Sequence, residues 1–231
     1  MLFRSIGHTG TLDPNASGVL PLVIGRATRL AKFLSGGRKT YEAVVHLGIT
    51  TDTYDAEGSP VGAPWRGRLP SQSEVVAALD AFRGTFLQQP PAYSAKKIDG
   101  ERSYHAARAG HLVLPDPVQV TVHSLDLVAM ADADVTLRVE CSAGFYVRSL
   151  AHDLGQRLGT GAHLSSLRRT VSSGLTIEEA IPLEHAEQSR EDALSAVLPM
   201  EAMLPAMPAV VLTDETLLLV LHGREIGRAH V

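Results

Sequence analysis

The segment Gly7-His8-Thr9-Gly10-Thr11-Leu12-Asp13-Pro14, close to the start of the chain, decides how the rest of the sequence is interpreted. Its two glycines and its proline indicate a loop whose backbone shape is strongly dictated. Pro14 directs Asp13 away from the α region, so the carboxylate stands on extended backbone. A rigid loop that presents one carboxylate suits a nucleophile or a general base. The same Asp-Pro pair also fits a helix N-cap followed by proline at the first helical position.

The composition is that of a globular protein with one large domain, or one domain plus an appendage, because 45% of its 231 residues are hydrophobic. No apolar run is long enough to span a membrane, and no charged-then-apolar leader precedes the chain, so a cytoplasmic protein is expected. The single cysteine, Cys141, excludes an internal disulfide and a cysteine-cluster metal site. The net charge of −4 is unusual for a nucleic-acid-binding protein. Short basic pairs such as Arg168-Arg169 could still form a local basic groove for RNA, or they could simply be solvated surface residues.

Both ends of the chain resemble translated sequencing-adapter DNA. We therefore expect residues 1–5 and 225–231 to be non-native and exclude them from the interpretation of the fold.

The order of the periodic segments predicts an α+β fold whose central sheet is mixed or antiparallel and is flanked by helices and loops. Strands are expected where apolar residues alternate, and helices where they recur every three or four residues. The capping-box sequence Ser71-Gln72-Ser73-Glu74 predicts the start of one helix. The predicted strands cover residues 39–48, 118–128, 135–141 and 163–171, and the predicted helices cover residues 27–35, 71–82, 145–158 and much of 176–198.

The acidic turn from Asp52 to Gly58 could suggest a calcium site. Its spacing does not match the EF-hand loop, which needs acidic residues at alternate positions. We therefore predict no metal site there, and the histidines of the chain show no metal-ligand spacing either.

The first motif, continued through Ala16, Gly18 and residues 20–28, closely resembles the signature of the TruB family of tRNA pseudouridine synthases. The resemblance implies that the catalytic carboxylate of the family falls on Asp13. It also implies that His8 and Thr11, which share the loop, belong to the substrate-binding surface. An eight-residue match of this composition is far more specific than an isolated Asp-Pro pair.

Other segments resemble the same family. The Lys-x-Tyr segment places on Tyr41 the aromatic residue that stacks on the target base and is a candidate general base. The segment 141–150 places the pocket tyrosine on Tyr146 and the arginine that pairs with the aspartate on Arg148. These two residues lie two apart, so on extended backbone they would project to the same side, and an arginine there could keep a buried carboxylate ionised. Leu167 corresponds to the apolar residue that lines the base pocket.

A further block, from Pro90 to Gly110, resembles the Pro-Pro-x-Tyr-Ser-Ala-x-Lys segment of the family and adds Tyr93 and Lys96 as residues of the active-site floor or of the RNA contact. Each of these residues also has an ordinary structural interpretation. A strand tyrosine is usually part of the core or the sheet surface, Leu167 could be a core leucine, and Arg148 could be a solvated arginine at a helix start.

The resemblance implies a pseudouridine synthase fold and an isomerase that converts uridine 55 in the T-loop of tRNA into pseudouridine after turning the base out of its stack. No metal or organic cofactor is required, the partner is tRNA, and a monomer is expected. It further implies a catalytic domain over residues 6–204 that lacks its first strand, and the truncated start of a C-terminal RNA-binding domain over residues 205–224. Two alternatives remain at this stage: an RNA-binding or tRNA-folding module without turnover, and a hydrolase unrelated to RNA with an aspartate nucleophile.

Overall fold

The computed structural model describes residues 5–93, 97–98, 101–102, 115–204, 207–208 and 210–224. The chain forms two compact units, Met1–Ala196 and Val197–Val231. The larger unit contains the sheet and all the described residues predicted to form the site. The adapter-like ends, apart from Ser5, fall outside the described residues.

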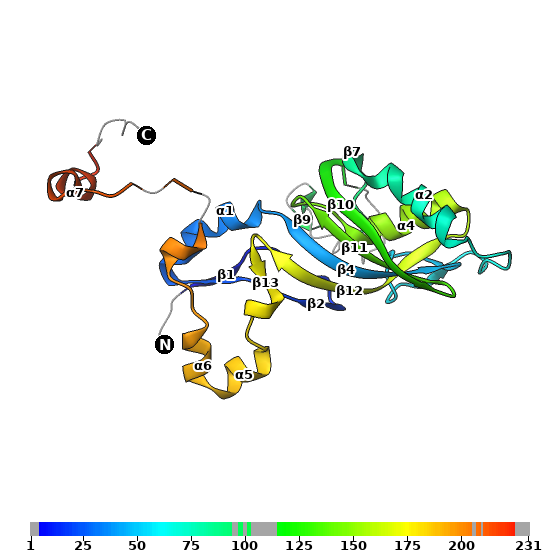
Figure 1. Cartoon of the computed structure of the whole chain (residues 1–231), viewed down its shortest axis with the longest axis horizontal. Coiled ribbons are helices and arrows are strands. Elements are labelled where there is room, and N and C mark those ends of the chain that lie inside the picture. Colours follow the sequence, from blue (N-terminus) through cyan, green and yellow to red (C-terminus); the bar gives the residue numbers. More distant parts are fainter. Residues whose placement is uncertain are drawn as a thin grey trace. The chain divides into compact units, whose positions relative to one another are not determined.

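The centre of the larger unit is a seven-stranded sheet with the order β13-β12-β4-β11-β10-β7, and β2 pairs with β12 beside β13 (Figure 1). The pairing of β2 with β12 is parallel and all other neighbours in this sheet are antiparallel. The predicted α+β fold with a mixed sheet is therefore confirmed. The strands are β2 (Ala16–Gly18), β4 (Lys39–Leu47), β7 (Gly84–Gln88), β10 (Val118–Ala131), β11 (Asp134–Cys141), β12 (Ala162–Ser172) and β13 (Leu175–Thr176).

The sheet buries one face because its central strands alternate between apolar and polar residues. On β4, Ala43, Val45 and Leu47 are almost fully buried. Leu137 and Val139 of the neighbouring β11 point to the same core. A register shift of one residue would turn every one of these side chains to the other face, so the pattern itself fixes the pairing.

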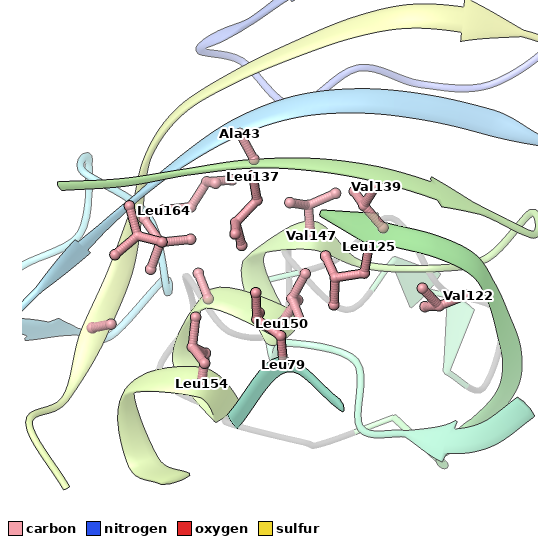
Figure 2. Close-up of a cluster of buried hydrophobic side chains, with 14 of the residues drawn as sticks. Ala43, Leu79, Val122, Leu125, Leu137, Val139, Val147, Leu150, Leu154 and Leu164 are labelled. Atoms are coloured by element: carbon pink, nitrogen blue, oxygen red, sulfur yellow. The ribbon is translucent and has the colours of Figure 1, made fainter. Parts of the chain in front are cut away.

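Two helices, α2 (Gln72–Leu79) and α4 (Val147–Leu158), cover the buried face of the sheet. Figure 2 shows Leu79 of α2 and Leu150 and Leu154 of α4 facing side chains from the strands. The predicted capping box at the start of α2 is present, since Ser71 accepts from the Glu74 amide and the Glu74 carboxylate accepts from the Ser71 amide. Helix α4 ends at Gly159, which adopts the left-handed conformation that terminates many helices.

Smaller elements complete the two units. Short antiparallel pairs are formed by β1 (Ile6–His8) with β3 (Leu22–Ile24), by β5 (Thr50–Thr51) with β6 (Pro60–Val61), and by β8 (Lys97–Ile98) with β9 (Glu101–Arg102). Among the described residues, the other helices of the larger unit are η1 (Gly25–Leu30), α1 (Ala31–Ser35), η2 (Asp80–Phe82), η3 (Ile177–Glu179), α5 (Leu183–Gln188) and α6 (Arg190–Ser195). Those of the smaller unit are η4 (Met200–Met203) and α7 (Asp214–Leu221). Within the described parts of the chain, every helix is too short or too polar to traverse a bilayer.

Candidate active site

The loop that carries Asp13 is fixed at both ends by strands. Before it, β1 pairs with β3, and behind it β2 runs parallel to β12. The Ala16 amide donates to the Asp13 carbonyl over 2.9 Å, so a turn follows the aspartate and leads directly into β2. The alternative of a helix N-cap at Asp13 is therefore wrong. Gly18 has a φ of 111° and a Cβ there would collide with the backbone of Arg169, so only glycine lets β2 approach β12 so closely.

The Asp13 carboxylate forms a bidentate ion pair with Arg148. The Arg148 Nε donates to Oδ2 and its Nη2 donates to Oδ1, both over 3.0 Å. The arginine side chain is only 8% exposed, whereas that of Asp13 is 34% exposed. The pairing therefore holds the carboxylate in one orientation at the edge of solvent, as the planar guanidinium fork allows.

Arg148 has three further partners, and they come from distant parts of the chain. It donates to the carbonyl of Thr53 over 3.2 Å and to the carbonyl of Tyr93 over 3.0 Å, and its Nη1 lies 3.4 Å from the Asp55 carboxylate. The arginine sits in the first turn of α4, because the helix begins at Val147 and Tyr146 is its extended N-cap residue. The helix predicted over residues 145–158 is therefore present from Val147 to Leu158, and Tyr146 and Arg148 do not share one extended segment.

Asp55 is a residue of this site that the sequence interpretation missed. Its side chain is 18% exposed. Its Oδ1 accepts hydrogen bonds from the Thr53 hydroxyl and the Glu57 amide, and a single parallel β-bridge links it to Leu164 of β12. The acidic turn therefore supplies a second carboxylate to Arg148.

Asp13, Asp55 and Arg148 border a small hollow whose apolar wall includes Ala16, Leu164 and Leu167. Its volume of about 20 Å³ accommodates roughly one water molecule, so a whole base would lie at its mouth. Leu167 is 8% exposed and pairs with Ala43 of β4 on one side and Ala16 of β2 on the other. The predicted pocket leucine thus lies beside the predicted catalytic aspartate.

Tyr41 is half-buried on β4, directly opposite Arg169 of β12. Burial raises the pKa of Tyr41 above its ordinary value, and the Asp13 carboxylate adds a smaller effect in the same direction. The guanidinium of Arg169, which also donates a hydrogen bond, opposes the rise in the pKa of Tyr41. The side chain is accordingly a neutral phenol at pH 7, which is suited to stacking and is a poor general base.

Tyr146 is held at the start of α4 by a glutamine that the sequence interpretation did not identify. The side chain of Gln88, which is 2% exposed, accepts from the Tyr146 amide over 2.8 Å and donates to the Tyr146 carbonyl over 2.9 Å. This double contact fixes the backbone of the residue that immediately precedes α4. It also anchors the end of β7 to the helix that carries Arg148.

Arg169 is 1% exposed and supports the Asp13 loop from behind, so the interpretation of the Arg168-Arg169 pair as surface applies only to Arg168. It donates to the carbonyls of Val19, Gly10 and Thr11 over 2.8, 3.2 and 3.5 Å. Lys39 lies nearby, and its pKa is lowered by burial and by the charge of Arg169. Arg169 therefore holds backbone carbonyls around the loop, whereas Lys39 donates to the carbonyls of Ser35 and Gly37; no local sequence motif indicates these contacts.

The remaining predicted substrate-binding residues have different positions. His8 and Thr11 are exposed on the loop, and His8 Nδ1 accepts from the Gly10 amide over 3.3 Å. Tyr93 contacts Arg148 through its backbone carbonyl, and Lys96 lies outside the described residues. Among the residues that the structure describes, no cluster of acidic, histidine or cysteine side chains could hold a metal ion. A larger hollow between α2 and the end of α4, of about 760 Å³, contains none of the predicted site residues.

Comparison with known protein families gives two matches that together span most of the chain. Residues 1–147 match the model of the TruB family pseudouridylate synthase N-terminal domain, and residues 148–205 match that of the tRNA pseudouridylate synthase B C-terminal domain. Curated relatives named tRNA pseudouridine synthase B include one from Solibacter usitatus, 46% identical over 96% of this chain and 76% of the relative. One from Burkholderia mallei is 45% identical over 96% of this chain and 74% of the relative.

Solved structures with the same fold include a Cbf5-Nop10-Gar1 complex, with a TM-score of 0.71 and 30% identity. A second is an H/ACA RNP bound to a substrate RNA containing 2'-deoxyuridine, with a TM-score of 0.70 and 28% identity. Both alignments cover 97% of this chain, which spans about 60% of the length of the matched chains.

Proposed function

Because the chain belongs to the TruB family of pseudouridylate synthases, we propose that it isomerises uridine 55 in the T-loop of tRNA, with Asp13 as the essential carboxylate. The family and the names of the relatives confirm the predicted enzyme class, an isomerase that forms pseudouridine in tRNA, and the likeness to the Cbf5 structures confirms the predicted fold. The observation that carries the proposal for the site is the bidentate Arg148–Asp13 pair beside the apolar wall formed by Leu167.

Formation of pseudouridine breaks the N1–C1′ glycosidic bond and joins C5 of the base to C1′. The proton on C5 leaves and N1 gains a proton, so the reaction consumes no oxidant or reductant and needs no cofactor for electron balance. An ionised Asp13 could attack the sugar or the base, or could remove a sugar proton to form a glycal. All of these routes need the orientation and the negative charge that Arg148 maintains.

The other residues take roles that follow from their positions. Tyr41 would stack on the turned-out base as a neutral phenol, and Leu167 would supply the apolar contact at the mouth of the hollow. Tyr146, fixed by Gln88 at the start of α4, would form another wall. His8 and Thr11 are exposed and would contact the RNA backbone, and we propose the same for Tyr93 and Lys96.

A basic surface supports binding of RNA despite the net charge of −4. Arg26, Arg29 and Lys32 are exposed along η1 and α1, and no acidic residue occurs between Asp13 and Glu42. In the described part of the chain, these three side chains form no ion pair with a carboxylate, so their charge is available to phosphates. The same proposal includes a monomeric protein in the cytoplasm. It also includes a catalytic domain over residues 6–204 and an RNA-binding segment over residues 205–224.

The test is pseudouridine formation in an unmodified T-arm stem-loop and in full-length tRNA, located by carbodiimide labelling and primer extension. Asp13→Asn should abolish the product while the RNA affinity stays close to that of the wild type. Asp126→Asn is the matched control, because Asp126 is an exposed strand aspartate outside the hollow. Full activity of Asp13→Asn would refute the assignment. RNA annealing by a wild type that forms no pseudouridine would favour the RNA-folding alternative.

A further inference from the structure

An aromatic stack joins Tyr54, the neighbour of two residues that contact Arg148, to His152 of α4. The ring of Tyr54 packs against the ring of His152 with centroids 3.9 Å apart and an interplanar angle of 16°. His152 lies on α4, four residues after Arg148, so both side chains occupy the same side of the helix. Tyr54 stands between Thr53 and Asp55, the two residues of the turn that contact Arg148. The stack therefore joins the helix that carries Arg148 to the turn that surrounds it.

The backbone of Tyr54 needs such support. Its φ of 66° is left-handed, a conformation that a bulky aromatic residue adopts only when surrounding contacts impose it. On one side the turn is held by β12, because the Leu164 amide donates to the Tyr54 carbonyl over 2.9 Å and the Ala56 amide donates to the Leu164 carbonyl over 3.0 Å. On the other side, the Tyr54 ring stacks on His152.

His152 has no competing role in the described structure. Its Nδ1 is buried, and among the described residues it has no hydrogen-bond partner. Burial lowers the pKa of His152, so the ring is neutral near pH 7 and packs as an uncharged aromatic disc. Burial, and then the nearby Asp153 carboxylate, raises the pKa of Tyr54, which also keeps the phenol neutral. The two rings are thus suited to mutual packing rather than to proton transfer.

We propose that Tyr54 and His152 form a positioning pair: their stack holds the 53–55 turn in its left-handed conformation, so that the Thr53 carbonyl and the Asp55 carboxylate fix Arg148 against Asp13. The pair touches neither the sugar nor the base, and its effect on the reaction passes through Arg148. This inference rests on the proposed function, because the pair is assigned the role of keeping Arg148 in place beside the Asp13 carboxylate.

The test compares four variants with the wild type: Tyr54→Phe, Tyr54→Leu, His152→Leu and the double leucine variant. Tyr54→Phe keeps the stack and should keep kcat close to that of the wild type. Each single leucine variant keeps apolar volume but removes the stack, and should lower kcat by about 10- to 100-fold with little change in KM for tRNA, as expected for misplaced catalytic groups. The double variant should be no worse than the more damaging single one, because both changes remove one interaction.

Thermal unfolding of each variant shows whether the fold survives, and kinetics are compared only among folded proteins. Crystal structures of the wild type and Tyr54→Leu provide a readout that does not depend on activity; the bidentate Arg148–Asp13 contact should be present in the first and broken in the second. If the wild type forms no pseudouridine in tRNA, the proposed function fails, and these two structures alone decide the positioning role.

Three outcomes would overturn the proposal that Tyr54 and His152 position Arg148. The first is a folded Tyr54→Leu or His152→Leu variant with the kcat of the wild type. The second is a loss in Tyr54→Phe as large as that in Tyr54→Leu, which would assign the role to the hydroxyl. The third is a rise in KM at constant kcat, which would mean that Tyr54 contacts RNA.

Discussion

Replacing Arg148 by methionine should destabilise the fold far more than neutralising Asp13, its partner in the ion pair. The arginine side chain is 8% exposed and contacts two carboxylates and two carbonyls. Arg148→Met leaves Asp13 and Asp55 near each other without the cation between them. Removing one member of a buried ion pair in this way costs about 3–5 kcal/mol, which is a large part of a total stability of about 5–15 kcal/mol.

Asp13→Asn should cost much less, because Arg148 then keeps Asp55 and both carbonyls as partners. One charge-assisted hydrogen bond is lost, and since the Asp13 side chain is one-third exposed, solvent reduces the loss to about 1 kcal/mol. The two substitutions therefore separate the proposed catalytic role of the Asp13 carboxylate from the structural role of Arg148.

Urea unfolding at pH 7 measures this difference. A loss of about 4 kcal/mol, divided by an m-value of about 2 kcal/mol per M, moves the midpoint by about 2 M for Arg148→Met and by about 0.5 M for Asp13→Asn. A triple variant, Arg148→Met with Asp13→Asn and Asp55→Asn, serves as the control and should recover part of the loss, because no carboxylate then lacks its partner. Equal costs for Arg148→Met and Asp13→Asn would refute the reasoning.

Two more outcomes can be checked. Burial raises the pKa of Asp153 from 3.8 to about 6. The folded state therefore binds this proton more tightly than the unfolded state, so the free energy of unfolding falls as the pH rises from about 4 to about 6. Asp153→Asn should therefore stabilise the protein by about 1 kcal/mol at pH 8, after allowance for partial exposure, and not at pH 3.5; a pH-independent effect in urea unfolding would contradict this. The double change Arg29→Glu and Lys32→Glu should weaken tRNA binding by about 10-fold or more at low salt, and less at high salt; an unchanged Kd in filter binding would argue against the basic surface.

The Asp13 loop and the sheet could be predicted because their information is local. The Gly-x-x-Gly spacing and Pro14 identify an ordered loop over eight residues, and the alternation of β4 and β11 is visible in each strand by itself. The capping box at Ser71 likewise needs only four residues. Each of these features is a short-range pattern that keeps its meaning without knowledge of the partner surface.

Asp55, Gln88 and Arg169 could not be identified in this way because their roles depend on contacts between residues far apart in the sequence. Asp55 lies in an acidic turn that was considered only as a calcium site and rejected for its spacing. Its proximity to Arg148 depends on how the turn pairs with β12. Arg169 follows another arginine on an alternating strand, so the sequence shows a basic pair and not which member is buried. The helix predicted from residue 145 begins at Val147, where Gln88 holds the backbone of Tyr146, a contact that the local sequence does not indicate.

Strand β12 explains why these distant groups meet. One edge pairs with β4, which places Tyr41 opposite Arg169, and the other edge pairs with β2, which places the Asp13 loop beside Leu167. Leu164 on the same strand holds the 54–56 turn through two backbone hydrogen bonds, and α4 packs against the strand with Gly155 facing Ala162. The positions of the carboxylates, the arginine and the aromatic residue therefore all depend on β12. For this reason, a substitution that shifts β12 should disturb the Asp13 loop, the 53–55 turn and Arg148 at once.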